Sequence, residues 1–266
     1  AYASEKGLGQ AFAFDMLGAG WDPARVKELA GGAIKRSHDM GSHTTWVLSN
    51  HDIIRHATRF GLPNGTDHGR WYKDNRFDPK VNVEQGLKRA NAMTALLLAL
   101  PGSTYLYQGE ELGLQEVLDI PAELMQDPQF FRNPELGLSR DGCRVPLPWT
   151  REGSSFGFGA NGSHLPQPEW YGAVSVEAED TDPSSTLNFY RKAVNLRKGL
   201  VTTQEIKWVK HFFNKNVLHF VRPNGWHSVT NFGTKPIKLP KGQVLISSQP
   251  LVDGKIAPNT TVWLQS

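Results

Sequence analysis

Short apolar runs alternate with longer amphipathic segments through the first two thirds of the chain. The run Ala11–Leu17 predicts a strand that places Phe12 and Phe14 on one face. Two further strands are predicted over His43–Asp52 and Ser103–Leu112. Strands separated by helical segments are typical of βα units around a parallel sheet. We therefore expect an α/β fold for this part of the chain.

Three helices are predicted between and after these strands. Asp22-Pro23 has the residues of an N-cap and a first helical position, and it opens a helix to about Ser37. A second helix, over about 82–100, ends where Pro101-Gly102 follows it. A third, over 184–200, has its apolar residues on one face.

Two long segments separate the predicted elements, the second of them (113–182) with little periodicity, and the pattern of the chain changes after Leu200. Thr58–Val81 is polar, and Gly113–Asp182 is rich in Pro, Gly and Trp. Loops of that length are usually functional or disordered, and the aromatic content argues for order. After Leu200, short strands separated by turn signals predict an antiparallel all-β domain over 203–266.

Composition excludes several classes of partner. The chain has 266 residues, of which 39% are hydrophobic and 21% charged, and its net charge is +3. This bias is too weak to indicate nucleic acid or a membrane surface. No apolar run approaches the roughly 18–20 residues of a membrane span. The single cysteine, Cys143, rules out an internal disulfide and suits a cytoplasmic location. No signal-peptide layout stands at the start, although this says little if the chain is a fragment.

The sharpest candidate for chemistry is Asn50-His51-Asp52 at the end of the second predicted strand. In a parallel βα barrel the functional face lies at the carboxyl ends of the strands, so a polar cluster there indicates binding or catalysis. The alternative is an ordinary strand-end turn in which Asp52 caps the next element.

Other polar residues near these strand ends have supporting roles in this interpretation. Arg55 and Arg59 could brace the cluster or form structural ion pairs. Glu110 and Glu111 end the third predicted strand, and we interpret them mainly as supporting or helix-capping groups. No His, Cys or carboxylate spacing indicates a metal, so we predict neither metal nor cofactor.

Several segments resemble glycoside hydrolase family 13, the α-amylase family. WVLSNHD (Trp46–Asp52) resembles the motif on barrel strand seven, and the other two predicted strands resemble the segments of strands six and eight. RDGCRVPLPW (Arg140–Trp149) is similar to the Arg-x-Pro-x-x-Trp signature of the α-glucosidase and oligo-1,6-glucosidase branch. The resemblance implies the last part, about strands six to eight, of a (β/α)8 TIM barrel over 1–202, with an excursion at 113–182, followed by a small β-sandwich-like domain.

The resemblance also implies a retaining glycosidase that acts on α-glucosides or their oligosaccharides. Such enzymes use a nucleophilic carboxylate and a proton-donating carboxylic acid. The family adds a third carboxylate that stabilises the transition state, and Asp52 matches it. His51, Asn50 and Arg144 match substrate-binding positions, with Arg144 expected close to Asp52.

The motifs of the nucleophile Asp and the acid Glu should lie before the first strand, and nothing in the chain replaces them. Three βα units also cannot close an eight-stranded barrel. We therefore expect the isolated chain to be inactive and to pair with a missing N-terminal half or with itself.

Three alternatives remain open. One is a non-catalytic family-13-like protein, such as the ectodomain of a transporter subunit, and another is a carbohydrate-binding β module beside an unrelated α/β part. The third is a family-13 isomerase or transglycosylase.

Overall fold

The structure is a computed structural model that describes residues 10–201, 203, 205–211 and 213–266. The chain forms two compact units. Unit 1 takes in the chain up to Leu48, then Lys88–Tyr105 and Arg191–Ser266. Unit 2 consists of Ser49–Leu87 and Leu106–Tyr190.

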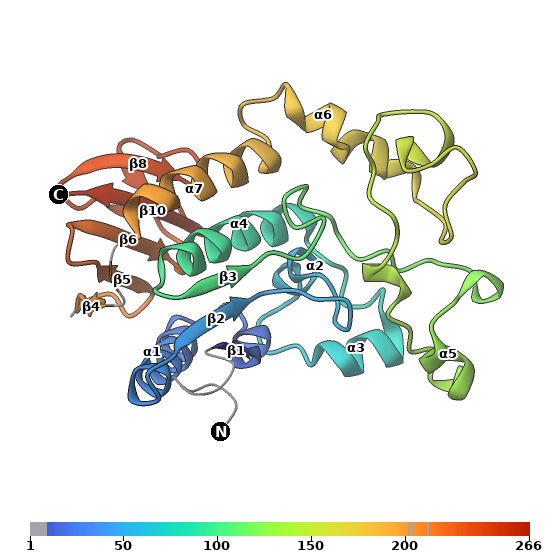
Figure 1. Cartoon of the computed structure of the whole chain (residues 1–266), viewed down its shortest axis with the longest axis horizontal. Coiled ribbons are helices and arrows are strands. Elements are labelled where there is room, and N and C mark those ends of the chain that lie inside the picture. The colour runs from blue at the N-terminus through green and yellow to red at the C-terminus, as the bar shows by residue number, and fades with distance from the viewer. Residues whose placement is uncertain (1–9, 202, 204, 212) are drawn as a thin grey trace. The chain divides into compact units, whose positions relative to one another are not determined.

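Unit 1 contains a parallel sheet of three strands, β1 (Gln10–Ala13), β2 (His43–Val47) and β3 (Ser103–Tyr105), in the order β1-β2-β3 (Figure 1). Helix α1 (Pro23–Asp39) connects the first two. Its N-cap Asp22 accepts hydrogen bonds from the Ala24 and Arg25 amides, as the sequence predicted. The α/β class is confirmed.

All three strands are shorter than predicted. After Ala13 the chain turns into a 3-10 helix, Phe14–Gly18, and Phe14 is 53% exposed. The prediction that Phe14 shares a strand face with Phe12 was therefore wrong. The second strand ends at Val47 and the third at Tyr105, because turns follow both. Gly109 adopts a φ of +88°, where a Cβ atom would lie 2.7 Å from Arg55 Nη1, so a strand cannot continue through it.

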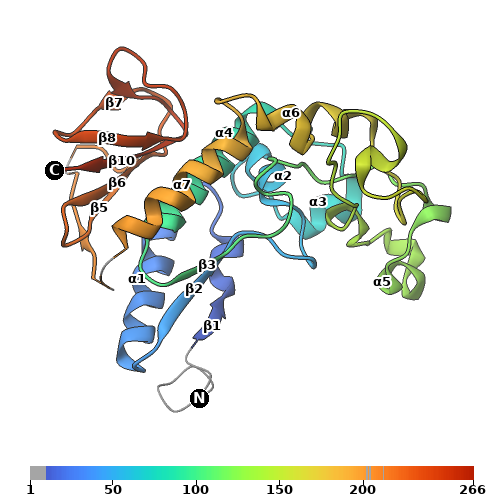
Figure 2. The same cartoon turned by 45° about the horizontal axis from the view of Figure 1, so that its top comes forward.

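Unit 1 also contains a five-stranded antiparallel sheet in the order β4-β5-β6-β10-β8 (Figure 2). The five are β4 (Lys207–Trp208), β5 (Val217–Val221), β6 (Trp226–Asn231), β8 (Gln243–Ser247) and β10 (Thr260–Gln265). A separate pair joins β7 (Ile237–Lys238) to β9 (Lys255–Ile256). The antiparallel strands predicted after Leu200 are present, and a domain division at 202/203 stays a prediction.

The two faces of strand β10 have different partners, as the alternation of side chains in a strand requires. Val262 and Leu264 are buried in a cluster with Ile256. On the other face Trp263 donates from Nε1 to the Ala95 carbonyl, 3.0 Å away in helix α4 (Val83–Ala99). Trp263 is 0% exposed, so this strand contributes to two cores.

His219 of β5, His227 of β6 and His211 in the connection between β4 and β5 form a hydrogen-bonded row, which we call the histidine row. His211 Nε2 lies 3.1 Å from His219 Nδ1, and His219 Nε2 lies 2.9 Å from His227 Nδ1. The Ser266 hydroxyl lies 3.2 Å from His227 Nε2 and ends the row. Burial, together with the other two rings, lowers the pKa of His219 to about 4.

Unit 2 consists of short helices and ordered loops. Its complete helices are α2 (His56–Gly61), α3 (His68–Asn75), α5 (Pro128–Arg132) and α6 (Val176–Asp180). The unit also includes the beginnings of α4 and of α7 (Thr186–Leu200). The sequence pattern missed α2 and α3, because each is too short to show helical periodicity.

The segment 113–182 is ordered, as its aromatic content had indicated. Its apolar side chains pack into a buried cluster that includes Leu114, Val117, Val145, Leu165 and Tyr171.

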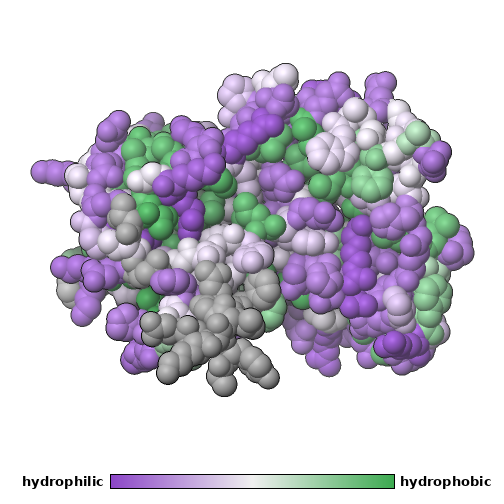
Figure 3. All heavy atoms as spheres, viewed as in Figure 1, coloured by the Kyte–Doolittle hydropathy of each residue, from purple (hydrophilic) through white to green (hydrophobic). Residues whose placement is uncertain are grey.

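On the face shown in Figure 3, hydrophilic residues are mixed with smaller hydrophobic areas. Within the part of the chain that the structure describes, no helix has the length and apolar character needed to cross a membrane.

Candidate functional site

The Asn50-His51-Asp52 cluster lies on an exposed loop between β2 and α2. Asn50 Oδ1 accepts a hydrogen bond from the Asp52 amide at 2.8 Å, which folds the tip of the loop. The side chains of His51 and Asp52 are 67% and 48% exposed, and His51 Nε2 lies 3.4 Å from Asp52 Oδ2. These residues were expected at the end of a strand, and they form an open polar turn that follows it.

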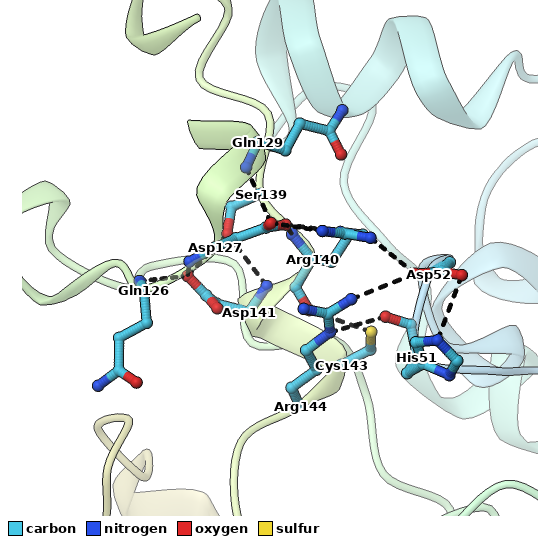
Figure 4. A network of polar contacts seen from close by, with 10 residues as sticks. All are labelled: His51, Asp52, Gln126, Asp127, Gln129, Ser139, Arg140, Asp141, Cys143 and Arg144. Carbon is cyan, nitrogen blue, oxygen red and sulfur yellow. Dashed lines mark hydrogen bonds and ion pairs between the residues drawn. The ribbon is translucent and has the colours of Figure 1, made fainter. Parts of the chain in front are cut away.

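Two arginines bind the same oxygen of Asp52 (Figure 4). Arg140 Nη1 lies 2.8 Å and Arg144 Nη2 lies 3.2 Å from Asp52 Oδ1. Arg144 Nε also donates to the His51 carbonyl at 2.8 Å. A 3-10 turn, Asp141–Cys143, separates the two arginines and directs both towards Asp52. The structure thus brings Arg144 to Asp52, where the sequence had placed it, and adds Arg140, which the sequence analysis had not selected.

Arg140 is itself held by a buried carboxylate. Its Nε and Nη2 atoms donate to Asp127 Oδ2 and Oδ1 at 2.8 and 2.7 Å, and the Asp127 side chain is 0% exposed. This two-point pairing fixes the plane of the guanidinium. The hydrogen bond from Arg140 lowers the pKa of Asp127 below its usual range. Asp127 precedes Pro128 at a helix start, a pattern that predicts a capping residue but not this partner.

Asp141 joins the two segments that carry Asp127 and Arg140. Its Oδ2 atom accepts hydrogen bonds from the amides of Gln126 and Asp127 at 2.7 and 3.0 Å and from the Ser139 hydroxyl at 2.9 Å. Arg140 is therefore held in place on the side away from Asp52 by buried, charge-assisted hydrogen bonds.

Arg55 lies beneath the loop and is buried. Its amide donates to Glu116 Oε2 at 2.8 Å. The guanidinium donates to the carbonyls of Gln108 at 2.8 Å and Cys143 at 2.9 Å. Arg55 thus links the Asp52 loop with the turn that separates Arg140 from Arg144. The supporting role predicted for it fits this placement.

Among the contacts of the described residues, none joins Glu110 or Glu111 to Asp52. Glu110 is buried 3.8 Å from His56 Nδ1, and burial raises its pKa to about 8. Glu111 Oε2 accepts a hydrogen bond from the Gly109 amide at 2.8 Å and so supports its own turn. Glu110 points to the interior, and Glu111 shapes a loop.

Other chemistry finds little support among residues 10–201, 203, 205–211 and 213–266. No group of three His, Cys, Asp or Glu side chains there could hold a metal ion. The Cys143 thiol is buried, and burial raises its pKa to about 12, which suppresses the nucleophilic thiolate.

Fold and site together define a class: an α/β protein in which an exposed carboxylate, Asp52, lies on a loop after a parallel strand and is bound by Arg140 and Arg144. The chain belongs to the α-amylase family. The family described as "Alpha amylase, catalytic domain" matches residues 21–205. The resemblance found in the sequence is confirmed.

The relatives agree on the branch of the family. The chain is 31% identical over 185 residues to a probable alpha-glucosidase of Rhizobium meliloti. The matched region covers 68% of this chain and 29% of that protein. It is 30% identical over 182 residues to an oligo-1,6-glucosidase of Saccharomyces cerevisiae. That matched region covers 59% of this chain and 27% of the yeast protein.

Solved structures match the chain over almost its whole length. An alpha-glucosyl transfer enzyme, XgtA, has a TM-score of 0.74 and 26% identity and covers 99% of this chain and 47% of its own. Trehalose-6-phosphate hydrolase of Bacillus licheniformis has a TM-score of 0.73 at 22% identity and covers 98% of this chain and 52% of its own, a likeness of fold. The chain therefore spans about half the length of these solved relatives.

Proposed function

We propose that this chain is part of a retaining α-glucosidase that removes terminal α-linked glucose from malto- and isomalto-oligosaccharides. We also propose that β1–β3 correspond to about strands six to eight of a (β/α)8 barrel, followed by a sandwich-like β domain. The relatives named α-glucosidase and oligo-1,6-glucosidase support the substrate class. The observation that carries the proposal is an exposed Asp52 held on one oxygen by Arg140 and Arg144.

In this proposal Asp52 is the carboxylate that stabilises the transition state. With both arginines on Oδ1, the Oδ2 atom remains on the side of His51, where it can accept hydrogen bonds from sugar hydroxyls. Such bonds strengthen as the ring distorts and positive charge develops at the anomeric carbon. His51, Asn50 and Arg144 would contact the same sugar, and Arg55 and Glu110 would support the loops from the interior.

The isolated 266-residue chain is proposed to be inactive. A retaining glycosidase needs two carboxyl groups about 5–5.5 Å apart across the bond that breaks. The other carboxylates in this network are Asp127, which is buried and held at two points by Arg140, and Asp141, which is buried and accepts hydrogen bonds from the Gln126 and Asp127 amides. The nucleophile Asp and the acid/base Glu would then be contributed by residues outside these 266, or the barrel would be completed by another chain.

Glucosyl transfer is a second candidate, because the solved relative with 26% identity is named an alpha-glucosyl transfer enzyme. Hydrolysis and transfer share the first chemical step and differ in whether water or a sugar hydroxyl accepts the glucosyl group. The Asp52 network serves both.

The test is an assay of the complete protein with maltose and isomaltose. We expect release of glucose whose first-formed anomer, followed by NMR, is α. Release of the β anomer, or no release from either sugar, would contradict a retaining α-glucosidase. Longer oligosaccharides formed at high maltose concentration would favour transfer. The 266-residue chain, assayed in parallel, should release nothing.

A further inference from the structure

Ser49 and His56 close the Asp52 loop into a ring. The Ser49 hydroxyl oxygen accepts the His56 amide hydrogen at 3.0 Å and lies 2.9 Å from His56 Nδ1. Both residues are buried, with 2% of each exposed. Ser49, which directly precedes the Asn50-His51-Asp52 cluster, is thus joined by two hydrogen bonds to His56, the first residue of helix α2.

We propose that His56 is a positioning residue for Asp52: through Ser49 it fixes the start of the loop that presents this carboxylate. Only the expected effect of His56 on turnover rests on the function proposed above. The structural content of the proposal, the placement of Asp52 against Arg140, can be measured without catalysis.

The far side of the loop is anchored separately. The Arg55 amide donates to Glu116 Oε2 at 2.8 Å, and Arg59 Nη1 donates to the Ile54 carbonyl at 2.7 Å. These contacts hold residues 54 and 55. Arg140 and Arg144 hold His51 and Asp52 at the tip of the loop. The pair of hydrogen bonds between Ser49 and His56 is therefore the anchor at the beginning of the loop.

The surroundings of His56 favour an uncharged ring. The side chains of Arg55 and Arg59 lie near it, and Glu110 Oε1 lies 3.8 Å from Nδ1. Burial, with Arg59 and Arg55, lowers the pKa of His56 to about 3. A neutral imidazole can accept the Ser49 hydroxyl hydrogen, whose oxygen already accepts the His56 amide. The buried contact then adds no further positive charge beside two arginines.

The first test uses the 266-residue chain and needs no activity. The ¹³C signal of the Asp52 carboxyl carbon reports its contacts with Arg140 and Arg144, and that of Asp127 is the internal control. We expect Ser49→Ala and His56→Leu to shift the Asp52 signal and to leave the Asp127 signal in place. Ser49→Thr keeps the hydroxyl and His56→Asn keeps a polar atom near Nδ1, so both should retain the wild-type signal. An unchanged Asp52 signal in folded Ser49→Ala would overturn the proposal.

The second test uses the complete protein and an aryl α-glucoside. A shift of about 1 Å in a catalytic group can cost on the order of 100-fold in rate, so Ser49→Ala should lower kcat by about 10- to 100-fold with a smaller change in KM. In an Asp52→Asn background the same change should cost little more, because its effect passes through Asp52. Full additivity of the two losses would refute positioning. If the wild-type protein is inactive, the proposed function fails, and the carboxyl signals still decide the role of His56.

Discussion

The Asp52 network of unit 2 and the histidine row of unit 1 arrange polar side chains in opposite ways. Around Asp52, charged groups on irregular loops meet at an exposed carboxylate, and buried partners such as Asp127 lie behind them. In the histidine row, two rings on the paired strands β5 and β6 and a third from the preceding connection bond mainly to one another, with His219 buried at the centre. The first arrangement leaves a carboxylate oxygen accessible for a ligand, and the second uses its polar atoms internally. We therefore expect changes in the first to alter activity and changes in the second to alter stability.

The largest effect should come from Asp52→Asn. The substitution keeps the shape but removes the charge that would stabilise the transition state, so we expect kcat of the complete protein to fall by about 1000-fold or more. The side chain is half exposed, so the midpoint of thermal unfolding should change little. Near-normal turnover would show that Asp52 does not have this role.

The opposite outcome is expected for Trp263→Ala in the sheet of unit 1. This ring is fully buried, packs edge to face on Trp226 with 4.9 Å between centroids, and donates to the Ala95 carbonyl. Its loss should lower the free energy of unfolding by about 3–5 kcal/mol, measured by urea denaturation. Phe213→Ala, which removes a fully exposed ring, is the matched control and should change it by less than about 0.5 kcal/mol.

The histidine row should make stability depend on pH. An unfolded histidine binds its proton near pH 6.5, whereas the pKa of folded His219 is about 4, so the unfolded state holds more protons between these values. The contribution of His219 to stability is fully present above about pH 6.5 and should fall by on the order of 3 kcal/mol as the pH drops to about 4. Urea denaturation at a series of pH values should show this slope. His219→Gln should reduce it and leave the part that comes from buried His56. Equal slopes in both proteins would contradict the assignment.

A smaller effect is expected for Arg140→Lys. Lysine keeps the positive charge but cannot pair with Asp127 at two points while it reaches Asp52. We expect kcat/KM of the complete protein to fall by about tenfold, since the charge remains but its direction is less fixed. Asp127→Asn should have a similar effect, and a loss as large as that of Asp52→Asn would give Arg140 a more direct part.

Local signals explain which parts of the fold could be predicted. Helix α1 was found because Asp22-Pro23 marks its start within the sequence itself. The strands were predicted too long, because an apolar run does not show where the pairing between strands ends. Helices α2 and α3 were missed, because their buried positions depend on packing that short segments do not reveal.

The site was predictable where a family motif covers it. Asp52 and Arg144 were paired in advance through the motif and the Arg-x-Pro-x-x-Trp signature. Arg140 and Asp127 were not, because their contacts join residues 88 and 13 positions apart and have no local pattern. The burial of Glu110 was equally invisible, since an acidic residue after an apolar run usually faces water.

The turn between Arg140 and Arg144 sets limits on how this segment can evolve. A Cβ atom on Gly142 would lie 2.4 Å from the Val117 carbonyl oxygen and 2.5 Å from Glu116 Oε1, so no larger residue fits there without displacing the backbone. An insertion between the arginines would rotate one guanidinium away from the shared oxygen while leaving both charges in the chain. Homologous proteins should therefore vary in the length of the loops on either side, yet keep this short spacer at constant length with glycine in its middle.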